Sequence, residues 1–265
     1  FAYQIGFNLA NNKSVVMSYN NPTGILSTYY EGQVLGELWG YNTPGIFQST
    51  EEVSSWANQS FLWAGKWNPG DLKYQDMNND GKIDNGKNTA TDHGDMVRLG
   101  NQLPQYTFGF NANASWKGFD FSILFQGVAK QDLYITEIFN GNVFRGPANG
   151  PLHMMVYEEH MDYWRDASSP LGANPNAYYA KPYSVFDGDN SKNYGRPVSR
   201  YLPSGAYLRM KNIRFGYTIP EKLTNKLLIK KANIYFSGEN LFVIKKIKPN
   251  KFAGLLNFIV TLTTT

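Results

Sequence analysis

The sequence predicts an all-β protein: an antiparallel transmembrane β-barrel segment with long extracellular loops. Three observations favour this fold class. Aromatic residues make up 15% of the 265 residues, which suits a barrel that needs aromatic girdles at both membrane interfaces. The segment 106–116 alternates apolar and polar side chains without a break. A second alternating segment follows after only Lys117 and Gly118, as expected of a tight hairpin.

The segment from Tyr106 to Trp116 is the clearest predicted strand. It is about as long as the ~9–11 residues that a tilted strand needs to cross a bilayer. Its apolar face begins and ends with an aromatic side chain that has a polar tip, which suits headgroup depth. On this strand and its neighbours, the predicted lipid-facing side chains are Phe108, Phe110, Phe121, Ile123, Phe125, Phe215 and Phe236. The predicted lumen-facing side chains are Asn111, Asn113, Ser122 and Gln126.

Further segments show the same period of two and are predicted as strands. They are 119–126, 206–218, 232–240 and 256–262. Near the start, 3–9 and 14–19 are predicted to form a hairpin around Asn11, Asn12 and Lys13. The segment 34–41 is a further predicted strand with a weaker pattern.

Two polar stretches, about 42–104 and 130–205, are much longer than the connections of a compact domain. In outer-membrane barrels the short turns face the periplasm and the long loops face outside. The hairpin turn at Lys117 and Gly118 therefore marks the inner end of the strands. Both long stretches are predicted to be extracellular, and the connection 219–231 is predicted to lie on the inner side.

Amino-acid composition excludes several other classes of protein. The chain has no Cys, which excludes a disulfide scaffold and a Cys-based zinc site. No run of about 18 apolar residues predicts a transmembrane helix. The net charge of +4 is mild, and a lysine cluster at 245–251 is interpreted as a solvated loop, so no nucleic-acid partner is expected. Because the chain begins at Phe1 with no initiator Met, we expect it to be part of a longer protein.

A series of short motifs adds a family resemblance. In order along the chain they include Leu38-Trp39-Gly40-Tyr41, Gly70-Asp71-Leu72-Lys73-Tyr74, Asp76-Met77-Asn78-Asn79-Asp80-Gly81, Trp116-Lys117-Gly118-Phe119-Asp120, Tyr207-Leu208-Arg209-Met210-Lys211-Asn212 and Ser237-Gly238-Glu239-Asn240-Leu241-Phe242. Their order and spacing resemble the carboxy-terminal third of SusC/RagA-type TonB-linked outer-membrane proteins. The resemblance covers about 31–242.

The resemblance implies that 1–265 is the carboxy-terminal portion of a roughly 22-stranded barrel, without the plug domain that fills such barrels. It implies no enzymatic activity. It implies uptake of oligosaccharides or peptides across the outer membrane of a Gram-negative bacterium, with membrane lipid, the TonB complex and a SusD-like lipoprotein as partners. About six to eight strands of such a barrel leave two unpaired edges, so we expect an open sheet. The end, Thr261 to Thr265, departs from the family's usual aromatic ending and leaves the place of the last strand open.

One motif predicts a structural calcium ion. Asp76, Asn78, Asp80 and Gly81 have the spacing that opens a calcium loop, with oxygen ligands at alternate positions. Lys82 would offer its backbone carbonyl, and Asp84 is ninth. The twelfth position is Lys87, which cannot ligate, so the resemblance assigns the closing acidic position to Asp95. The alternative is an Asp/Asn/Gly turn held by side-chain-to-backbone hydrogen bonds.

Three aromatic residues in the second long stretch are candidates for contact with a ligand or a partner: Trp164, Tyr178 and Tyr179. Aromatic faces stack on sugar rings, and the resemblance places this segment opposite the lipoprotein lid. The alternative, which we favour, is a packing role within the loop or against the lid.

Two other functions compete with transport. One is a soluble, calcium-stabilised carbohydrate-binding β-sandwich, since antiparallel sandwich strands also alternate. The other is a secreted glycosidase fragment, for which the carboxylates are Glu158, Glu159, Asp162 and Asp166. These four residues are better interpreted as a solvated loop face. Detergent dependence of the purified protein distinguishes the barrel from both alternatives.

Overall fold

The computed structural model describes residues 1–134, 161–183, 190–227, 229–245 and 255–264. The chain divides into two units. Unit 1 consists of Phe1–Lys13, Leu103–Asp132 and Ser204–Thr265, and unit 2 consists of Ser14–Gln102 and Leu133–Pro203. None of the helices among the described residues is long and apolar enough to span a membrane.

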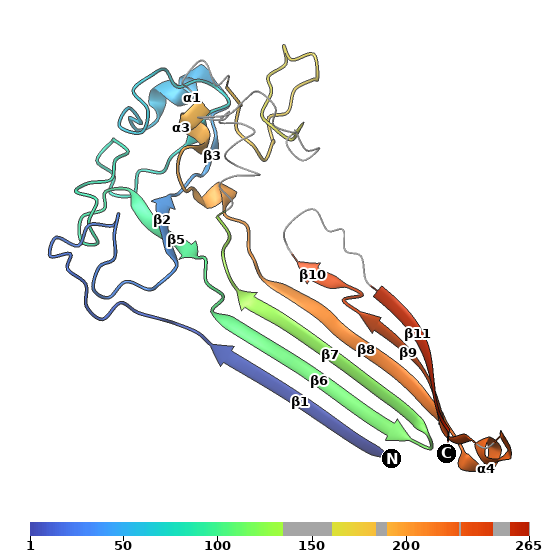
Figure 1. Cartoon of the computed structure of the whole chain (residues 1–265). Coiled ribbons are helices and arrows are strands. Elements are labelled where there is room, and N and C mark those ends of the chain that lie inside the picture. Colours follow the sequence, from blue (N-terminus) through green and yellow to red (C-terminus); the bar gives the residue numbers. More distant parts are fainter. Residues whose placement is uncertain (135–160, 184–189, 228, 246–254, 265) are drawn as a thin grey trace. The chain divides into compact units, whose positions relative to one another are not determined.

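Unit 1 is built around one antiparallel sheet whose long strands lie side by side (Figure 1). Its strands are β1 (Ala2–Asn11), β6 (Tyr106–Trp116), β7 (Phe119–Lys130), β8 (Tyr207–Ile219), β9 (Ile229–Glu239), β10 (Val243–Lys245) and β11 (Leu255–Thr264). The order is β1-β6-β7-β8-β9-β11, and β10 pairs with β8. β1 and β11 form opposite edges, so the predicted open sheet is confirmed for the described residues. The predicted last strand is also confirmed, because β11 pairs with β9.

The cross-strand register confirms the predicted division into two faces. Phe110 lies opposite Phe125, Phe121 opposite Phe215, and Phe215 opposite Phe236. Residues directly opposite each other share a face, so the predicted apolar set lies on one side of the sheet. Asn113 lies opposite Ser122 on the other side. The rings of Phe110 and Phe125 are 6.3 Å apart, as expected of neighbours on one face.

The apolar face of this sheet is bare. Trp116 is 52% exposed and Phe215 is 50% exposed. Among the described residues of unit 1, no second sheet packs against these side chains (Figure 1). A soluble sandwich buries its aromatic face between two sheets. The bare face instead suits contact with hydrocarbon.

The turn between β6 and β7 is the predicted two-residue hairpin. Lys117 has a φ of 47° and Gly118 a φ of 87°. Positive φ at both central residues is the requirement of a type I′ turn, whose twist matches that of the flanking strands. Gly adopts this conformation without steric cost. The amide of Thr218 donates to the Gly118 carbonyl at 2.7 Å, which ties β8 to the turn.

The predicted hairpin near the start of the chain is wrong. The segments 3–9 and 14–19 do not form a hairpin, because β1 pairs with β6 along its whole length. The segment 14–19 makes only an isolated bridge, from Val15 to Val34. The predicted strand in 34–41 is confirmed for Glu37–Tyr41, which form β2. This strand belongs to unit 2 and pairs with β5 (Met96–Asn101). An alternating pattern identifies a strand and not its partner.

Unit 2 combines most of the two predicted long loops into one folded body. Besides β2 and β5 it contains β3 (Gly45–Ile46), α1 (Thr50–Ser55), β4 (Leu72–Lys73), α3 (Asn190–Tyr194) and η3 (Ser199–Tyr201). Its core is rich in tyrosine and is drawn from both loops. The core side chains include Tyr41, Leu72, Tyr74, Ile83, Trp164, Tyr179, Tyr194, Val198 and Tyr201. In unit 1, the short helices α4 (Glu221–Thr224) and η4 (Asn225–Leu227) connect β8 to β9.

Substitution of two adjacent residues on β6, Ala112 and Asn113, compares the two faces at the same depth in the membrane. Ala112→Lys places a charge on the apolar face near the middle of the strand, and Asn113→Lys places the same charge on the polar face. We expect Ala112→Lys to cost ~2–4 kcal/mol and Asn113→Lys much less. The measurement is urea unfolding of the protein in lipid vesicles. Equal losses of stability in the two variants would contradict the assignment of the apolar face to lipid.

Candidate functional site

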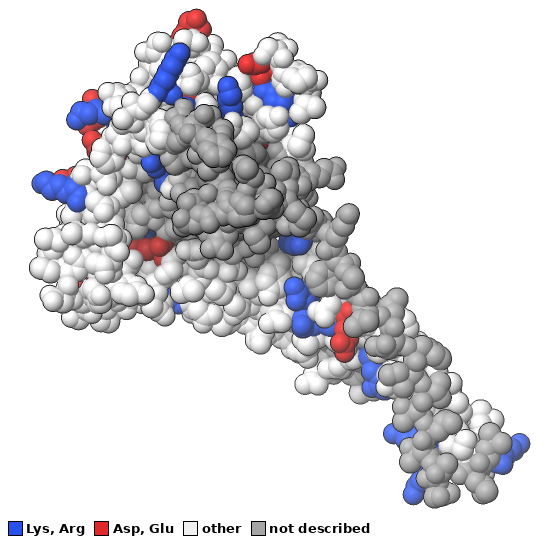
Figure 2. All heavy atoms as spheres, turned by 45° about the horizontal axis from the view of Figure 1, so that its top comes forward, with Lys and Arg blue, Asp and Glu red and all other residues white. Residues whose placement is uncertain are grey.

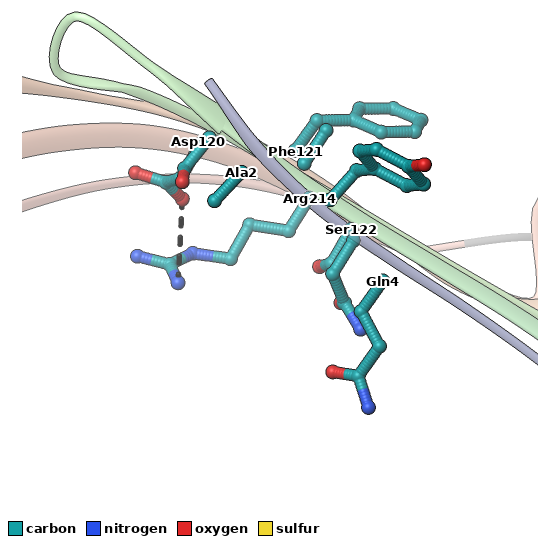
Figure 3. A pocket seen from close by; sticks show the side chains of 10 residues that line it. Ala2, Gln4, Asp120, Phe121, Ser122 and Arg214 are labelled. Carbon is teal, nitrogen blue, oxygen red and sulfur yellow. Dashed lines mark ion pairs between the residues drawn. The ribbon is translucent and has the colours of Figure 1, made fainter.

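A hollow of about 460 Å³ is lined by residues of the sheet, most of which lie on its polar face (Figure 3). Side chains from β1, β6, β7 and β8 line it. The polar ones are Gln4, Asn113, Ser115, Asp120, Ser122 and Arg214. Four strands meet here because β6 lies between β1 and β7, and β7 lies between β6 and β8.

Arg214 is the cation of this hollow. Its guanidinium lies 3.6 Å from the Asp120 carboxylate, and it donates to the Asn233 side-chain oxygen at 3.3 Å. The guanidinium also lies 4.3 Å from the centre of the Tyr235 ring. Arg214 and Asp120 are both partly exposed, so their ion pair contributes modestly to stability. The hollow thus combines amides, hydroxyls, one cation and one anion, which can bind polar solutes reversibly.

Glycines opposite amide side chains shape the rest of this face. Gly6 lies opposite Asn111, and Gly109 lies opposite Asn8. A Cβ at Gly6 would collide with the Asn111 side-chain oxygen, and one at Gly109 would lie 2.5 Å from that of Asn8. Each asparagine therefore occupies the space that its partner glycine leaves empty.

A fully buried ion pair lies inside unit 2. The Lys192 ammonium is 2.8 Å from the Asp71 carboxylate, and both side chains are fully buried. The other Asp71 oxygen accepts from the Tyr183 hydroxyl at 2.8 Å and the Asn193 amide at 3.0 Å. Lys192 also donates to the Lys66 carbonyl at 3.0 Å. The charges are thus paired and hydrogen-bonded, as burial requires.

This ion pair joins the two long loops. Asp71 and Lys66 belong to the first, while Tyr183, Lys192 and Asn193 belong to the second. The sequence carries no signal for the contact, since Asp71 follows a glycine in a turn and Lys192 lies in a polar stretch. Only the folded contact, more than a hundred residues apart in the chain, identifies it.

The three aromatic candidates lie in this same unit. Trp164 and Tyr179 are buried in its core, and the Trp164 indole donates to the Gln48 side chain at 3.0 Å. Tyr178 is 40% exposed, and its hydroxyl donates to the Arg200 carbonyl at 2.9 Å. Burial raises the pKa of Tyr178, and the neighbouring Arg200 charge opposes this shift. Of the three, Tyr178 has the most surface available to a ligand or partner, and such a contact stays a prediction.

The residues of the predicted calcium loop form a tight turn. Asp76 accepts from the amides of Asn79 at 2.6 Å and Gly81 at 2.8 Å. Asp80 accepts from the amide of Lys82 at 2.9 Å. The fully buried Asp95 accepts from the amides of Met77 at 2.7 Å and Asp84 at 2.8 Å. Backbone hydrogen bonds to carboxylates therefore hold this loop closed.

The oxygen donors of this loop suit a hard cation, but their arrangement is not a metal cage. Among the described residues, no group of three or more His, Cys, Asp or Glu side chains could hold a metal ion. The sequence prediction requires side-chain oxygens of Asp76, Asn78, Asp80, Asp84 and Asp95 and the Lys82 carbonyl to converge on one ion. In this structure each of these five side chains accepts from backbone amides. Calcium binding stays a prediction.

Two carboxylates considered for glycoside hydrolysis, Glu158 and Glu159, lie outside the described residues. Asp162 and Asp166 are described and make local contacts. Asp162 accepts from the Asn174 amide at 3.0 Å, and Asp166 accepts from the Ser168 hydroxyl at 2.6 Å. The hydrogen bonds from Ser168 lower the pKa of Asp166, as suits an ionised loop carboxylate.

The open sheet, with one bare aromatic face and one polar face, defines the wall of an outer-membrane β-barrel. No protein-family model matches the chain. TonB-dependent receptor P3 of Formosa agariphila is 30% identical over 212 residues, which cover 80% of this chain and 18% of that receptor. TonB-dependent receptor P26 of the same organism is 30% identical over 202 residues, 75% of this chain and 18% of that receptor.

Solved structures show the same fold. The chain matches the RagAB peptide transporter with a TM-score of 0.55 at 18% identity, over 93% of this chain and 24% of that one. The RagAB peptide importer in the open-open state gives a TM-score of 0.50 at 15% identity, over 93% and 23%. The likeness confirms the predicted barrel segment.

This chain belongs to the TonB-dependent receptors, and its location is the outer membrane of a Gram-negative bacterium. It spans about a fifth of the length of the receptors that it matches, 18% in each case. The names of its relatives, receptors and transporters, agree with the prediction that it is not an enzyme.

Replacement of Lys192 tests the buried ion pair. Lys192→Met leaves the Asp71 carboxylate buried with no counter-charge, so we expect unit 2 to lose about 3–5 kcal/mol of stability. The measurement is the urea midpoint of tryptophan fluorescence, combined with protease cleavage in unit 2. Lys82→Met is the control, because Lys82 is exposed and its ion pair with Asp80 at 3.6 Å should contribute less than about 1 kcal/mol. Similar losses in the two variants would mean that the buried pair has no special role.

Thermal melting tests the calcium prediction. The protein in detergent is melted with calcium and then with chelator, and Asp80→Ala is melted in the same way. A calcium-dependent rise in Tm that disappears in Asp80→Ala supports a site in the Asp76 loop. If the parent shows no shift, only the hydrogen-bonded turn remains. A shift that survives in Asp80→Ala places the ion elsewhere.

Proposed function

We propose that this chain forms part of the barrel wall and an extracellular loop unit of an importer that takes up nutrients through TonB. The bare aromatic face of the sheet carries this proposal, because exposed Phe and Trp side chains in such number need a hydrocarbon environment. The opposite face offers amides, hydroxyls and the Arg214–Asp120 pair. A wall of this kind binds and passes polar solutes and breaks no bond.

The connections support an orientation in the membrane. The two-residue turn at Lys117 and Gly118 and the short α4–η4 connection lie at one end of the sheet. The segments that lead into unit 2 leave from the other ends of β1, β6, β7 and β8. Since short turns face the periplasm in outer-membrane barrels, unit 2 is extracellular in this proposal.

The cargo that we propose is an oligosaccharide or a peptide, delivered with a SusD-like lipoprotein. The polar lining of the hollow suits both classes, because amides and hydroxyls bind sugar hydroxyls as well as peptide groups. The half-exposed Tyr178 on unit 2 is the aromatic surface that we assign to the lipoprotein or the cargo. One solved structure of the same fold is named a peptide transporter, which supports testing peptides alongside sugars.

Uptake by whole cells tests the proposal. Cells that lack the receptor, and cells in which it is restored, are given fluorescent oligosaccharides and fluorescent peptides of similar mass. We expect restored uptake of one class, and we expect this uptake to stop when TonB is deleted or the proton-motive force is collapsed. Deletion of the lipoprotein gene beside the receptor gene should also reduce uptake.

Two outcomes would contradict the proposal. Uptake that continues at the full rate without TonB would indicate passive diffusion. A receptor that is found in the soluble fraction, and that stays monomeric without detergent, would instead favour the soluble carbohydrate-binding alternative.

A further inference from the structure

A group of exposed lysines lies at the turn end of the sheet. It consists of Lys117 in the β6–β7 turn, Lys222 in α4, Lys226 in η4 and Lys230 at the start of β9, here called the inner-end lysines. The strand register holds their segments together, since Phe119 lies opposite Tyr217 and Ile219 lies opposite Ala232. Figure 2 shows basic side chains at this end of unit 1, coloured blue.

The charge of this group is not balanced locally. Within 220–231, Lys222, Lys226, Lys230 and Lys231 stand against the single carboxylate of Glu221. Among the described residues, none of the inner-end lysines has an ion pair in the structure. Exposed positive charge in excess at one end of the sheet attracts an anionic surface.

The lysines adjoin the apolar face. The Lys117 ammonium lies 5.1 Å from the Trp116 ring, and Trp116 belongs to that face. Phe119 and Tyr217, with ring centres 4.5 Å apart, extend the same aromatic border. Tyr and Trp favour headgroup depth, so ammonium groups just beyond them lie at the depth of lipid phosphates.

An exposed leucine lies within the basic segment. Leu223 is 61% exposed, directly after Lys222 in α4. An apolar side chain among lysines suits the boundary between headgroups and acyl chains, where lysine stems and leucine both contact lipid. An acidic soluble partner would satisfy the lysines but would leave the neighbouring Trp116 and Leu223 without an apolar environment.

We propose that the inner-end lysines bind the phosphate groups of anionic phospholipids in the inner leaflet of the outer membrane. The proposal rests on the membrane orientation given under Proposed function. Lys231 is not part of the site, because strand alternation places it with Asn233 on the polar face.

Lipid titration tests this site in the receptor that contains this chain, purified in detergent. Fluorescent phosphatidylglycerol and fluorescent phosphatidylcholine are added separately to the parent and to a variant with all four lysines replaced by Gln. We expect the parent to prefer phosphatidylglycerol, and we expect the variant to bind it about tenfold more weakly or worse. Binding of phosphatidylcholine should be similar in both. The preference of the parent should fade in 1 M salt, where the Debye length is about 3 Å.

A charge-matched control replaces four exposed lysines elsewhere with Gln: Lys13, Lys66, Lys82 and Lys87. It should bind phosphatidylglycerol as the parent does. A variant with Arg at the four inner-end positions keeps the charge and should retain binding. This variant still tests the proposal if the Gln variant fails to fold. Unchanged binding in the folded Gln variant would overturn the proposal, as would an equal loss in the control or the absence of any preference in the parent. Loss of this lipid preference with uptake intact would leave the proposed transport function standing.

Discussion

The register between β6 and β7 is the constraint on which the sheet depends. It follows from the turn at Lys117 and Gly118, whose two positive φ angles allow a two-residue connection and so place Trp116 opposite Phe119. Because side chains alternate with a period of two, a slip of one residue would move Phe108 and Phe110 to the polar face. Between the turn and Leu124, β8 continues this register, with Phe121 opposite Phe215, until a shift after Leu124. The separation of the apolar and polar faces follows from this pairing.

Unit 2 depends on a different interaction. Its regular elements are short, so its order comes from its buried side chains, among them the Asp71–Lys192 pair. Burial raises the pKa of the core tyrosines Tyr41 and Tyr74, to about 12 for Tyr41. The Tyr74 hydroxyl stays protonated and donates to the Lys192 carbonyl at 2.7 Å. Ordering such long segments costs conformational entropy, which a core shared by both segments helps to offset.

The sequence predicted the sheet better than the loops because the sheet has local signals. The strand 106–116 and its turn match β6 and the start of β7, since alternation and Gly118 are visible in adjacent residues. The pairing of β1 was wrong, because its partner follows more than ninety residues later in the chain. The core of unit 2 was not predicted, since contacts such as Asp71 with Lys192 leave no periodic pattern. The motif at Asp76 predicted a hydrogen-bonded turn or a calcium site. The structure contains the turn, and calcium binding stays a prediction.

The glycines opposite Asn8 and Asn111 have a consequence for the bore of the barrel. Each asparagine side chain lies over the glycine opposite it. Each residue pair therefore presents one side chain to the polar face where two would otherwise project. A wall built this way keeps its donors and acceptors near the backbone surface. In the importer that we propose, a molecule passing these two pairs would therefore meet amide groups close to the backbone and no projecting side chain at the glycines.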